Sequence, residues 1–208
     1  MIDLTAALAE NPLIAILRGL APENARPVSD VLFDTGFRII EVPLNSPDPL
    51  ESITQIVAKH GVQAIVGAGT VLTTDQVAAV ADAGGRIIVS PNMNPDVGRA
   101  AVARDLYWCP GIMTPSEAFA ALDIGASVLK LFPAEMVPPA AIAALRAVFP
   151  ADAVIAAVGG ITPETMASYH AAGADGFGLG SALFKPSYTL DDIGRRARAF
   201  TSVLEELG

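Results

Sequence analysis

Cysteine is almost absent from this chain, since Cys109 is the only one among its 208 residues. A single thiol excludes an internal disulfide, and such scarcity is typical of proteins from a reducing compartment. Trp108 and Pro110 flank Cys109 in an apolar segment, so we interpret the thiol as an inert core group. The first residues, MIDLTAALAEN, lack the basic start of a secretory signal. We therefore expect a cytoplasmic location.

Charge is also scarce, and positive charge in particular. Charged residues make up only 17% of the chain, and the formal net charge is −9 at pH 7. This acidity argues against a nucleic-acid partner, whose backbone would repel the chain. It leaves a phosphorylated metabolite open, because backbone N–H groups can bind phosphate without a net positive charge. The chain lacks an apolar run of the roughly 18 residues that a membrane span requires, so we expect no membrane association.

Residue spacings typical of metal sites are missing as well. The two histidines, His60 and His170, lie far from any predicted strand end, and we interpret both as surface residues. No cluster of His, Cys, Asp or Glu has the spacing of a metal-ligand set. We therefore expect neither a metal ion nor another cofactor.

What the chain does contain is one unit repeated along its length. A helical pattern ends at a glycine and a short apolar strand follows, as in FDTGFRII (33–40) and LDIGASVL (122–129). Glycine there supplies the left-handed conformation that ends a helix, and we expect the same of Gly61. Thr73 and Thr114 begin capping boxes that start helices. The pattern predicts eight near-continuously apolar strands, over residues 13–17, 38–42, 63–67, 86–90, 106–110, 127–132, 154–159 and 175–180.

Eight strand–helix units in one chain predict a (β/α)8 TIM barrel that forms a single domain over residues 1–208. An open, doubly wound sheet is the alternative. The even spacing and the lack of a long insertion favour a closed barrel. In such barrels the carboxyl ends of the strands carry the chemistry. Candidate residues at those ends are Arg18, Glu41, Thr70, Pro91, Lys130, Phe132, Gly159, Gly160, Gly180 and Ser181.

Lys130, one of only three lysines, lies in the middle of the apolar strand SVLKLF. Side chains alternate along a strand, so an inward Lys130 places Val128 and Phe132 inside and Leu129 and Leu131 outside. Burial lowers the pKa of a lysine, and the free amine can attack a ketone to form a Schiff base. The alternative is a structural lysine paired with a carboxylate.

Glu41 lies inside IIEVPL, another apolar strand, with Ile39 on the same face. Alternate strands of a barrel share interior layers, so Glu41 could face Lys130 across the mouth. A carboxylate there could move protons for an imine-forming lysine. It would also favour the charged amine, so we expect a water-bridged separation rather than a tight ion pair. A buried partner for an arginine is the alternative.

Anion-binding groups follow several other strands. Arg18 could hold a carboxylate or a phosphate in bidentate fashion, or form an ordinary salt bridge. Thr70 could bind the same anion or cap the next helix. The segments VGGITPE (158–164) and GLGS (178–181) follow the last two predicted strands, where barrels of this kind often bind phosphate. Their glycines allow backbone N–H groups to approach an oxyanion closely.

The motifs LIAILRG, IIEVPLNSP, VGAGTVL, IVSPN, CPGIMTPSEA, VLKLFPAE, VGGITPE and GLGSALF occur in this order along nearly the whole chain. Together they resemble the small class I aldolases of the 2-keto-3-deoxy-6-phosphogluconate family. The gluconate branch of that family usually has arginine where this chain has Asn45, and threonine where it has Val158. These departures favour the galactonate branch, whose substrate differs at C4, with the gluconate as the alternative.

The resemblance implies roles for the candidate residues. Lys130 would form the Schiff base and Glu41 would be the acid/base residue. The implied reaction is a retro-aldol cleavage of a phosphorylated keto acid that releases pyruvate and glyceraldehyde 3-phosphate. Family members are typically homotrimers. Substrate contacts would come from Arg18 and Thr70 at the keto-acid end, from Gly159, Gly160, Gly180 and Ser181 at the phosphate, and from Asn45, Pro91, Phe132 and Val158 elsewhere.

Two other classes of function fit a barrel of this kind. A phosphosugar isomerase or epimerase would use acid/base groups without an imine. A catalytically silent barrel could simply bind a phosphorylated ligand. Lys130 and Glu41 within strand interiors argue against the silent barrel.

Overall fold

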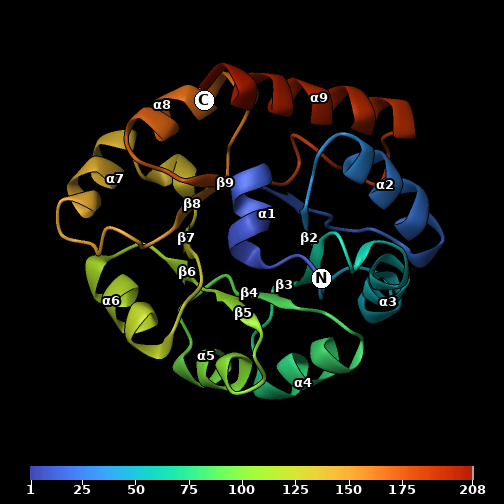
Figure 1. Ribbon diagram of the computed structural model, residues 1–208, viewed down its shortest axis with the longest axis horizontal. Helices are drawn as coiled ribbons and strands as arrows, with labels where there is room; N and C mark the ends of the chain where they lie inside the picture. The colour runs from blue at the N-terminus through green and yellow to red at the C-terminus, as the bar shows by residue number, and fades with distance from the viewer. Residues whose placement is uncertain (208) are drawn as a thin grey trace.

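The computed structural model describes residues 1–207 and shows a closed parallel barrel surrounded by helices (Figure 1). The sheet order is β5-β4-β3-β2-β1-β9-β8-β7-β6, and every pairing is parallel. The predicted (β/α)8 architecture is therefore confirmed. The strands are β1 (Leu13–Ile16), β2 (Ile39–Pro43), β3 (Ile65–Gly69), β4 (Ile87–Val89), β5 (Tyr107–Cys109), β6 (Gly111–Ile112), β7 (Leu129–Leu131), β8 (Ile155–Val158) and β9 (Gly176–Leu179).

The helices alternate with these strands along the chain and form the outer ring in Figure 1. They are α1 (Leu4–Glu10), α2 (Pro22–Asp34), α3 (Pro49–His60), α4 (Thr74–Asp82), α5 (Pro95–Val102), α6 (Pro115–Ile124), α7 (Pro139–Arg146), α8 (Pro163–Ala171) and α9 (Leu190–Leu207), with a 3₁₀ turn η1 at Ala134–Met136. Among the described residues, none of these helices combines the length and the apolar character that a membrane span needs.

The fifth predicted strand is split into β5 and β6 at Pro110, which has no N–H to donate to a ladder. The break does not open the barrel. The carbonyl of Trp108 accepts from the N–H of Ser127 at 2.8 Å, and the carbonyl of Pro110 accepts from the N–H of Lys130 at 3.0 Å. The two edge strands of the sheet, β5 and β6, are consecutive in the chain and together take the place of one strand. The closed barrel therefore has eight strand positions.

Local signals in the sequence set most helix boundaries. Thr73 and Thr114 form the predicted capping boxes, with Gln76 and Glu117 as their partners. Gly125 ends α6 with φ 103, in the predicted left-handed conformation. The same prediction is wrong for Gly61, whose φ is −60, because the chain continues through a right-handed turn after α3.

Helix α1 closes the amino-terminal end of the barrel, a role that no sequence pattern had indicated. In Figure 1 it lies across the centre of the strand ring. Its buried residues Leu4 and Ala7 pack against the inward-facing side chains, among them Ile14 and Ile39. The N–H of Leu4 donates to the hydroxyl of Tyr107 at 3.2 Å. Since this end is covered, an opening to the interior can lie only at the carboxyl ends of the strands.

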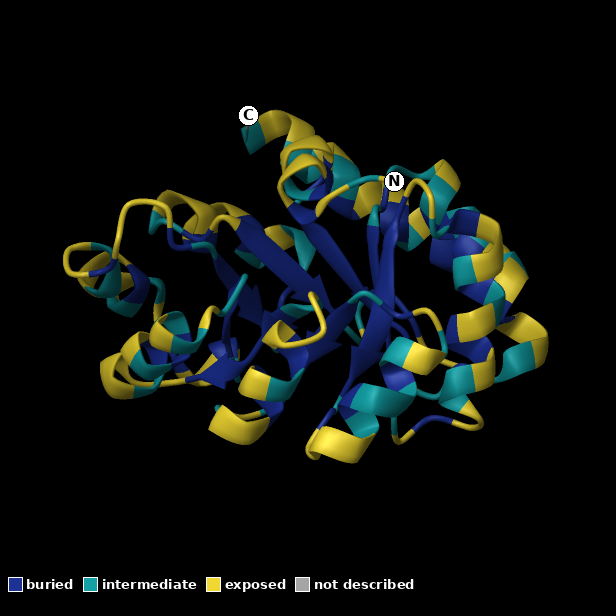
Figure 2. Ribbon diagram, turned by 60° about the horizontal axis from the view of Figure 1, so that its bottom comes forward, coloured by how far each residue is buried: buried dark blue, intermediate teal, exposed yellow. Residues whose placement is uncertain are grey.

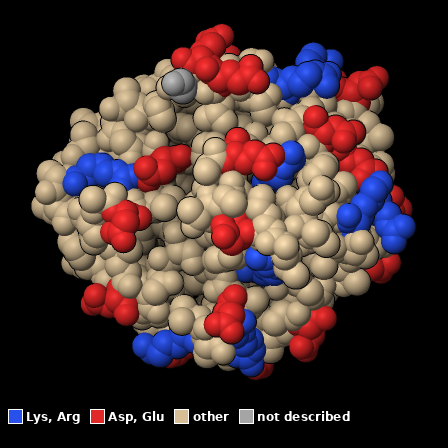
Figure 3. Space-filling model, viewed as in Figure 1, with Lys and Arg blue, Asp and Glu red and all other residues tan. Residues whose placement is uncertain are grey.

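The strands are almost entirely buried (Figure 2), and they separate an inner apolar cluster from an outer one. Alternate residues of each strand face the barrel interior or the helices, as strand geometry requires. On β2, for example, Ile39 belongs to the inner cluster while Ile40 and Val42 belong to the outer one. Acidic and basic side chains are interspersed on the face that carries α1, which has no extended basic patch (Figure 3).

The interpretation of His60 as a surface residue is wrong. Its side chain is buried at the end of α3, stacks on the ring of Phe33 and lies 2.8 Å from a carboxylate oxygen of Asp30 on α2. This contact holds α2 against α3. His170 is exposed, as expected.

Candidate active site

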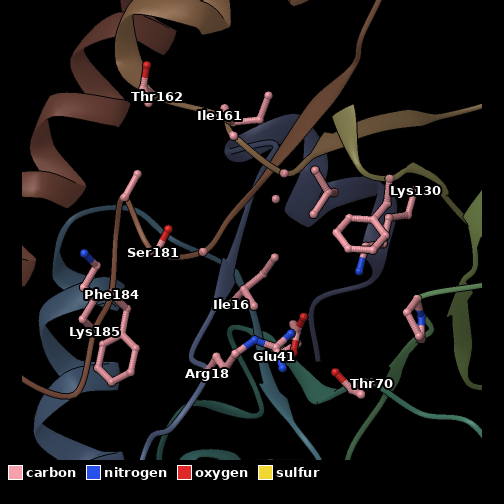
Figure 4. Close-up of a pocket in the computed structure, with 18 of the residues that line it drawn as sticks. Ile16, Arg18, Glu41, Thr70, Lys130, Ile161, Thr162, Ser181, Phe184 and Lys185 are labelled. Carbon is pink, nitrogen blue, oxygen red and sulfur yellow. The ribbon is translucent and has the colours of Figure 1, made fainter. Parts of the chain in front are cut away.

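A cavity of about 500 Å³ opens at the carboxyl ends of the strands, opposite α1. Seven of the strands contribute to its wall, through their carboxyl ends or through the loops that follow them. Figure 4 shows Arg18, Glu41, Thr70 and Lys130 gathered around it. The residues that line it are Ile16, Arg18, Glu41, Thr70, Pro91, Lys130, Phe132, Val158, Gly159, Gly160, Ile161, Thr162, Gly178, Gly180, Ser181, Ala182, Phe184, Lys185 and Pro186.

Lys130 reaches this cavity from β7 in the predicted inward orientation. Val128 lies in the inner core with Phe132 packed against it, whereas Leu129 and Leu131 belong to the outer core. The Lys130 side chain is only 8% exposed, and its Nζ lies 4.6 Å from the centroid of the Phe132 ring. Burial lowers the pKa of this amine, and the charge of Glu41 only partly opposes the shift. The amine is thus a strong nucleophile at lower pH than a surface lysine.

Glu41 projects into the same cavity from β2 and is 2% exposed. Burial raises the pKa of its carboxyl to about 7, against the opposing charges of Lys130 and Arg18. Glu41 and Lys130 do not form a direct ion pair. Its Oε2 is buried without a hydrogen-bond partner among the described residues. A carboxyl that titrates near neutrality beside a nucleophilic amine can both donate and accept protons.

Of the two glycines of β3, Gly69 makes room for the Glu41 carboxyl, whereas a Cβ atom at Gly67 would meet the backbone of Ile87 on β4. Gly67 and Gly69 alternate with Val66 and Ala68 of the outer core, so they face the interior, where they present no side chain. A Cβ atom at Gly69 would overlap the carboxyl group of Glu41. The carboxyl therefore occupies the space that a side chain at Gly69 would fill.

Arg18 also lines the cavity and has no carboxylate partner within the described chain, so the salt-bridge alternative finds no support. Its Nη1 instead donates to Oδ1 of Asn45 at 2.6 Å. Asn45 itself is absent from the cavity wall. Asn45 thus orients the guanidinium group of Arg18, and its direct contact with a substrate stays a prediction.

Thr70 lines the cavity with a left-handed backbone, at φ 57. It does not cap the next helix, because Thr73 does so. Its hydroxyl is therefore available to a ligand. The apolar candidates Pro91, Phe132 and Val158 also lie in the cavity wall.

The loops after β8 and β9 present unused backbone donors to the cavity. Gly159 and Gly160 both have positive φ, at 107 and 67. Within the described chain, no hydrogen bond is donated by the backbone N–H groups of Gly159, Gly160, Ile161, Gly180, Ser181 and Ala182. Successive free N–H groups with such conformations form concave sites for anions. In the part of the chain that the structure describes, no group of His, Cys, Asp and Glu side chains is arranged to hold a metal ion.

Sequence reasoning missed several wall residues. Ile16 and Gly178 could have been found, because each precedes a predicted residue, Arg18 or Gly180, by two positions on the same strand face. The segment from Phe184 to Pro186 carried no such signal, because it belongs to a loop without strand alternation.

A family model for KDPG and KHG aldolases matches residues 4–195. The chain belongs to this aldolase family. A probable 2-dehydro-3-deoxy-6-phosphogalactonate aldolase of Rhizobium meliloti (strain 1021) is 52% identical over 190 residues, which cover 91% of this chain and 90% of the relative. The 2-dehydro-3-deoxy-6-phosphogalactonate aldolase of Escherichia coli (strain K12) is 45% identical over 94% of this chain and 95% of its own.

The fold of the aldolase agrees with this membership. A solved structure described as native KDPGal superimposes with a TM-score of 0.93 at 44% identity, over 94% of this chain and 95% of the other. The chain is thus a carbon–carbon lyase of the aldolase type, as the order of its motifs had indicated.

Proposed function

We propose that this aldolase cleaves 2-dehydro-3-deoxy-6-phosphogalactonate to pyruvate and D-glyceraldehyde 3-phosphate through a Schiff base on Lys130. The observation that carries the mechanism is a buried lysine with a lowered pKa, directed into a cavity at the carboxyl ends of the strands. The relatives at 52% and 45% identity, both named for the galactonate, support the substrate.

In this mechanism the free amine of Lys130 attacks the C2 ketone, and the carbinolamine loses water to give a protonated imine. Glu41, directly or through a water molecule, removes the proton of the C4 hydroxyl. The C3–C4 bond breaks, its electron pair moves into the imine to form an enamine, and glyceraldehyde 3-phosphate leaves. The enamine is then protonated at C3, and hydrolysis of the imine releases pyruvate and restores Lys130.

Glu41 suits both directions of proton transfer because its pKa of about 7 lies near neutrality. Its carboxylate form accepts the C4 proton, and its acid form can protonate the enamine. Phe132, packed beside the amine, would keep water from the imine.

Anion-binding groups would hold the two ends of the substrate. Arg18, oriented by Asn45, and the hydroxyl of Thr70 would bind the carboxylate end. The free N–H groups after β8 and β9 would bind the phosphate, with Ser181 adding a hydroxyl.

Borohydride reduction in the presence of pyruvate, followed by mass mapping, tests the mechanism. We expect the reduced adduct on Lys130, and we expect Lys130→Ala to abolish both the adduct and the cleavage. Lys59 and Lys185, the other two lysines, serve as internal controls in the same spectrum. An adduct on either of them, or none at all, would contradict the proposal; an absent adduct with sugar turnover would favour an isomerase or epimerase.

The alternative substrate within the family is the gluconate epimer. Asn45 and Val158 stand where the gluconate branch usually has arginine and threonine, and Val158 lies in the cavity wall. Parallel assays of the two C4 epimers separate the substrates, and a higher kcat/KM for the gluconate would overturn the galactonate proposal.

The family resemblance supports a trimeric assembly, and the scarcity of cysteine supports a cytoplasmic location. We propose a cytoplasmic homotrimer without a metal ion or another cofactor. Light scattering should then give three times the 21.4 kDa mass of the chain.

A further inference from the structure

Lys185 is a cavity residue for which the mechanism has no use. It follows β9 in the same loop as Ser181 and lines the cavity together with Gly160 and Thr162. Figure 4 shows Lys185 and Lys130 on opposite sides of the cavity. The ammonium group of Lys185 is therefore far from the reacting amine and belongs to the side with the free backbone donors.

Among the described residues, no acidic side chain pairs with the ammonium group of Lys185. Lys185 is exposed, forms no ion pair and donates no side-chain hydrogen bond to any residue from 1 to 207. Its Nζ lies 5.6 Å from the centroid of the Tyr188 ring. Lys59, by contrast, pairs with Asp30 at 2.5 Å. Like Arg18 and Lys130, Lys185 therefore brings a positive charge without a carboxylate partner among the described residues to the cavity of a chain whose net charge is −9.

The glycine-rich loops alone supply no positive charge to balance the negative charge of a bound phosphate. Their N–H groups can donate hydrogen bonds to a phosphate, but they carry no net charge. The carboxylate of Glu135 lies against the outer side of Gly160, where a Cβ atom would come within 2.7 Å of its Oε2. This negative charge opposes a phosphate dianion in the loop. A cation on the cavity side would offset that repulsion.

We propose that Lys185 is the counter-charge that selects a phosphorylated substrate, through the phosphate of the substrate and of the aldehyde product. The inference rests on the proposed function for the orientation of the substrate in the cavity. Lys185 contacts the phosphate and takes no part in the aldol chemistry. Its flexible side chain at the rim also attracts the phosphate before the substrate is bound.

The test compares Lys185→Met and Lys185→Arg with Lys59→Met as the matched control, because both methionine variants remove one lysine charge. Glycerol 3-phosphate serves as a probe by calorimetric titration, with glycerol as its uncharged counterpart. We expect Lys185→Met to weaken glycerol 3-phosphate binding about 10-fold, the range of one hydrogen bond to a charged group. Lys185→Arg should retain most of the affinity, and Lys59→Met should match the unaltered protein.

Kinetics and trapping distinguish this inference from the proposed mechanism. Lys185→Met should raise KM for the phosphorylated substrate with little change in kcat, and pyruvate should still be trapped on Lys130. The effect should shrink at high salt, since an exposed cation is readily screened. Unchanged binding in Lys185→Met, or an equal loss in Lys59→Met, would overturn the role of Lys185. Failure to trap pyruvate on Lys130 of the unaltered protein would instead overturn the Schiff-base mechanism.

Discussion

At the scale of single residues, the site depends on two ionisable groups, Lys130 and Glu41, whose pKa values are shifted by burial. Burial lowers the pKa of Lys130 and raises that of Glu41 to about 7, so burial disfavours the charged form of both groups. A direct ion pair would cancel both shifts by stabilising both charges. The separation of the two groups is therefore needed for catalysis. The backbone position that sets it can be tested by mutation.

Gly69 sets the position of the Glu41 carboxyl. In Gly69→Ala the new methyl group would overlap that carboxyl and displace it. A shift of about 1 Å in a reacting group can cost about 100-fold in rate, so we expect a fall in kcat of that order. Steady-state cleavage assays measure the fall.

A double-mutant cycle shows whether Gly69 acts through Glu41. In a Glu41→Ala background the carboxyl is gone, and Gly69→Ala should lower the free energy of unfolding less than it does in the unaltered chain. Equal losses in both backgrounds, measured by urea denaturation, would mean that Gly69 only supports the strand.

At the scale of elements, strand alternation explains how much of the site the sequence could predict. Lys130 and Glu41 lie on short buried strands, where a period of two fixes which face each side chain takes, and Arg18 follows the end of β1 by two positions. The structure confirms the inward orientation of Lys130 and of Glu41 with Ile39. The same reasoning recovers the capping boxes at Thr73 and Thr114, because a cap is a local contact over three residues.

Loops and helix contacts escape this kind of prediction. Asn45 follows β2 in a loop, and its contact with Arg18 spans 27 positions that no local pattern encodes. His60 is buried only because α2 supplies Asp30 and Phe33 next to it. Lys185 was not singled out for the same reason. Tertiary packing, not propensity, decides these positions.

Helix α7 has one fully buried apolar residue, Ile142, and depends on a polar anchor instead. Arg146 donates to the carbonyl of Gly173 at 2.7 Å and to that of Ala153 at 2.5 Å, and it pairs with Asp175. Asp175 also accepts from the N–H of Ile155 at 2.7 Å. Arg146 thus ties α7 to the chain that enters β8 and β9.

Arg146→Met should therefore lower the free energy of unfolding by about 3 kcal/mol, because it leaves several partly buried acceptors without a donor. Urea denaturation measures the loss. Arg99→Met is the control, since the Arg99–Asp96 pair is exposed and should contribute less than about 1 kcal/mol. The anchor lies at the amino-terminal ends of the strands, so kcat per folded molecule should not change. A similar loss in both variants would contradict the anchor.

At the scale of the whole molecule, the barrel is sealed at one end and reactive at the other. Helix α1 closes the amino-terminal end with apolar contacts, and the carboxyl ends hold the buried ionisable groups. Such groups lower the stability of the fold, because the unfolded chain would ionise them freely in water. The stability of the whole protein should therefore carry a signature of the site.

Glu41 supplies that signature through pH. Its pKa is about 7 in the folded chain, whereas the ordinary pKa of a glutamate in water is 4.5, so between these values the folded chain binds more protons than the unfolded one. Through this group, the free energy of unfolding falls as pH rises across that window. Glu41→Gln removes the effect, so its stability relative to the unaltered chain should increase by about 2 kcal/mol from pH 5 to pH 8. Urea denaturation of both proteins at the two pH values measures the difference. A constant difference would mean that the carboxyl of Glu41 ionises in the folded chain as it does in water, and a carboxyl of that kind could not return a proton to the enamine near pH 7.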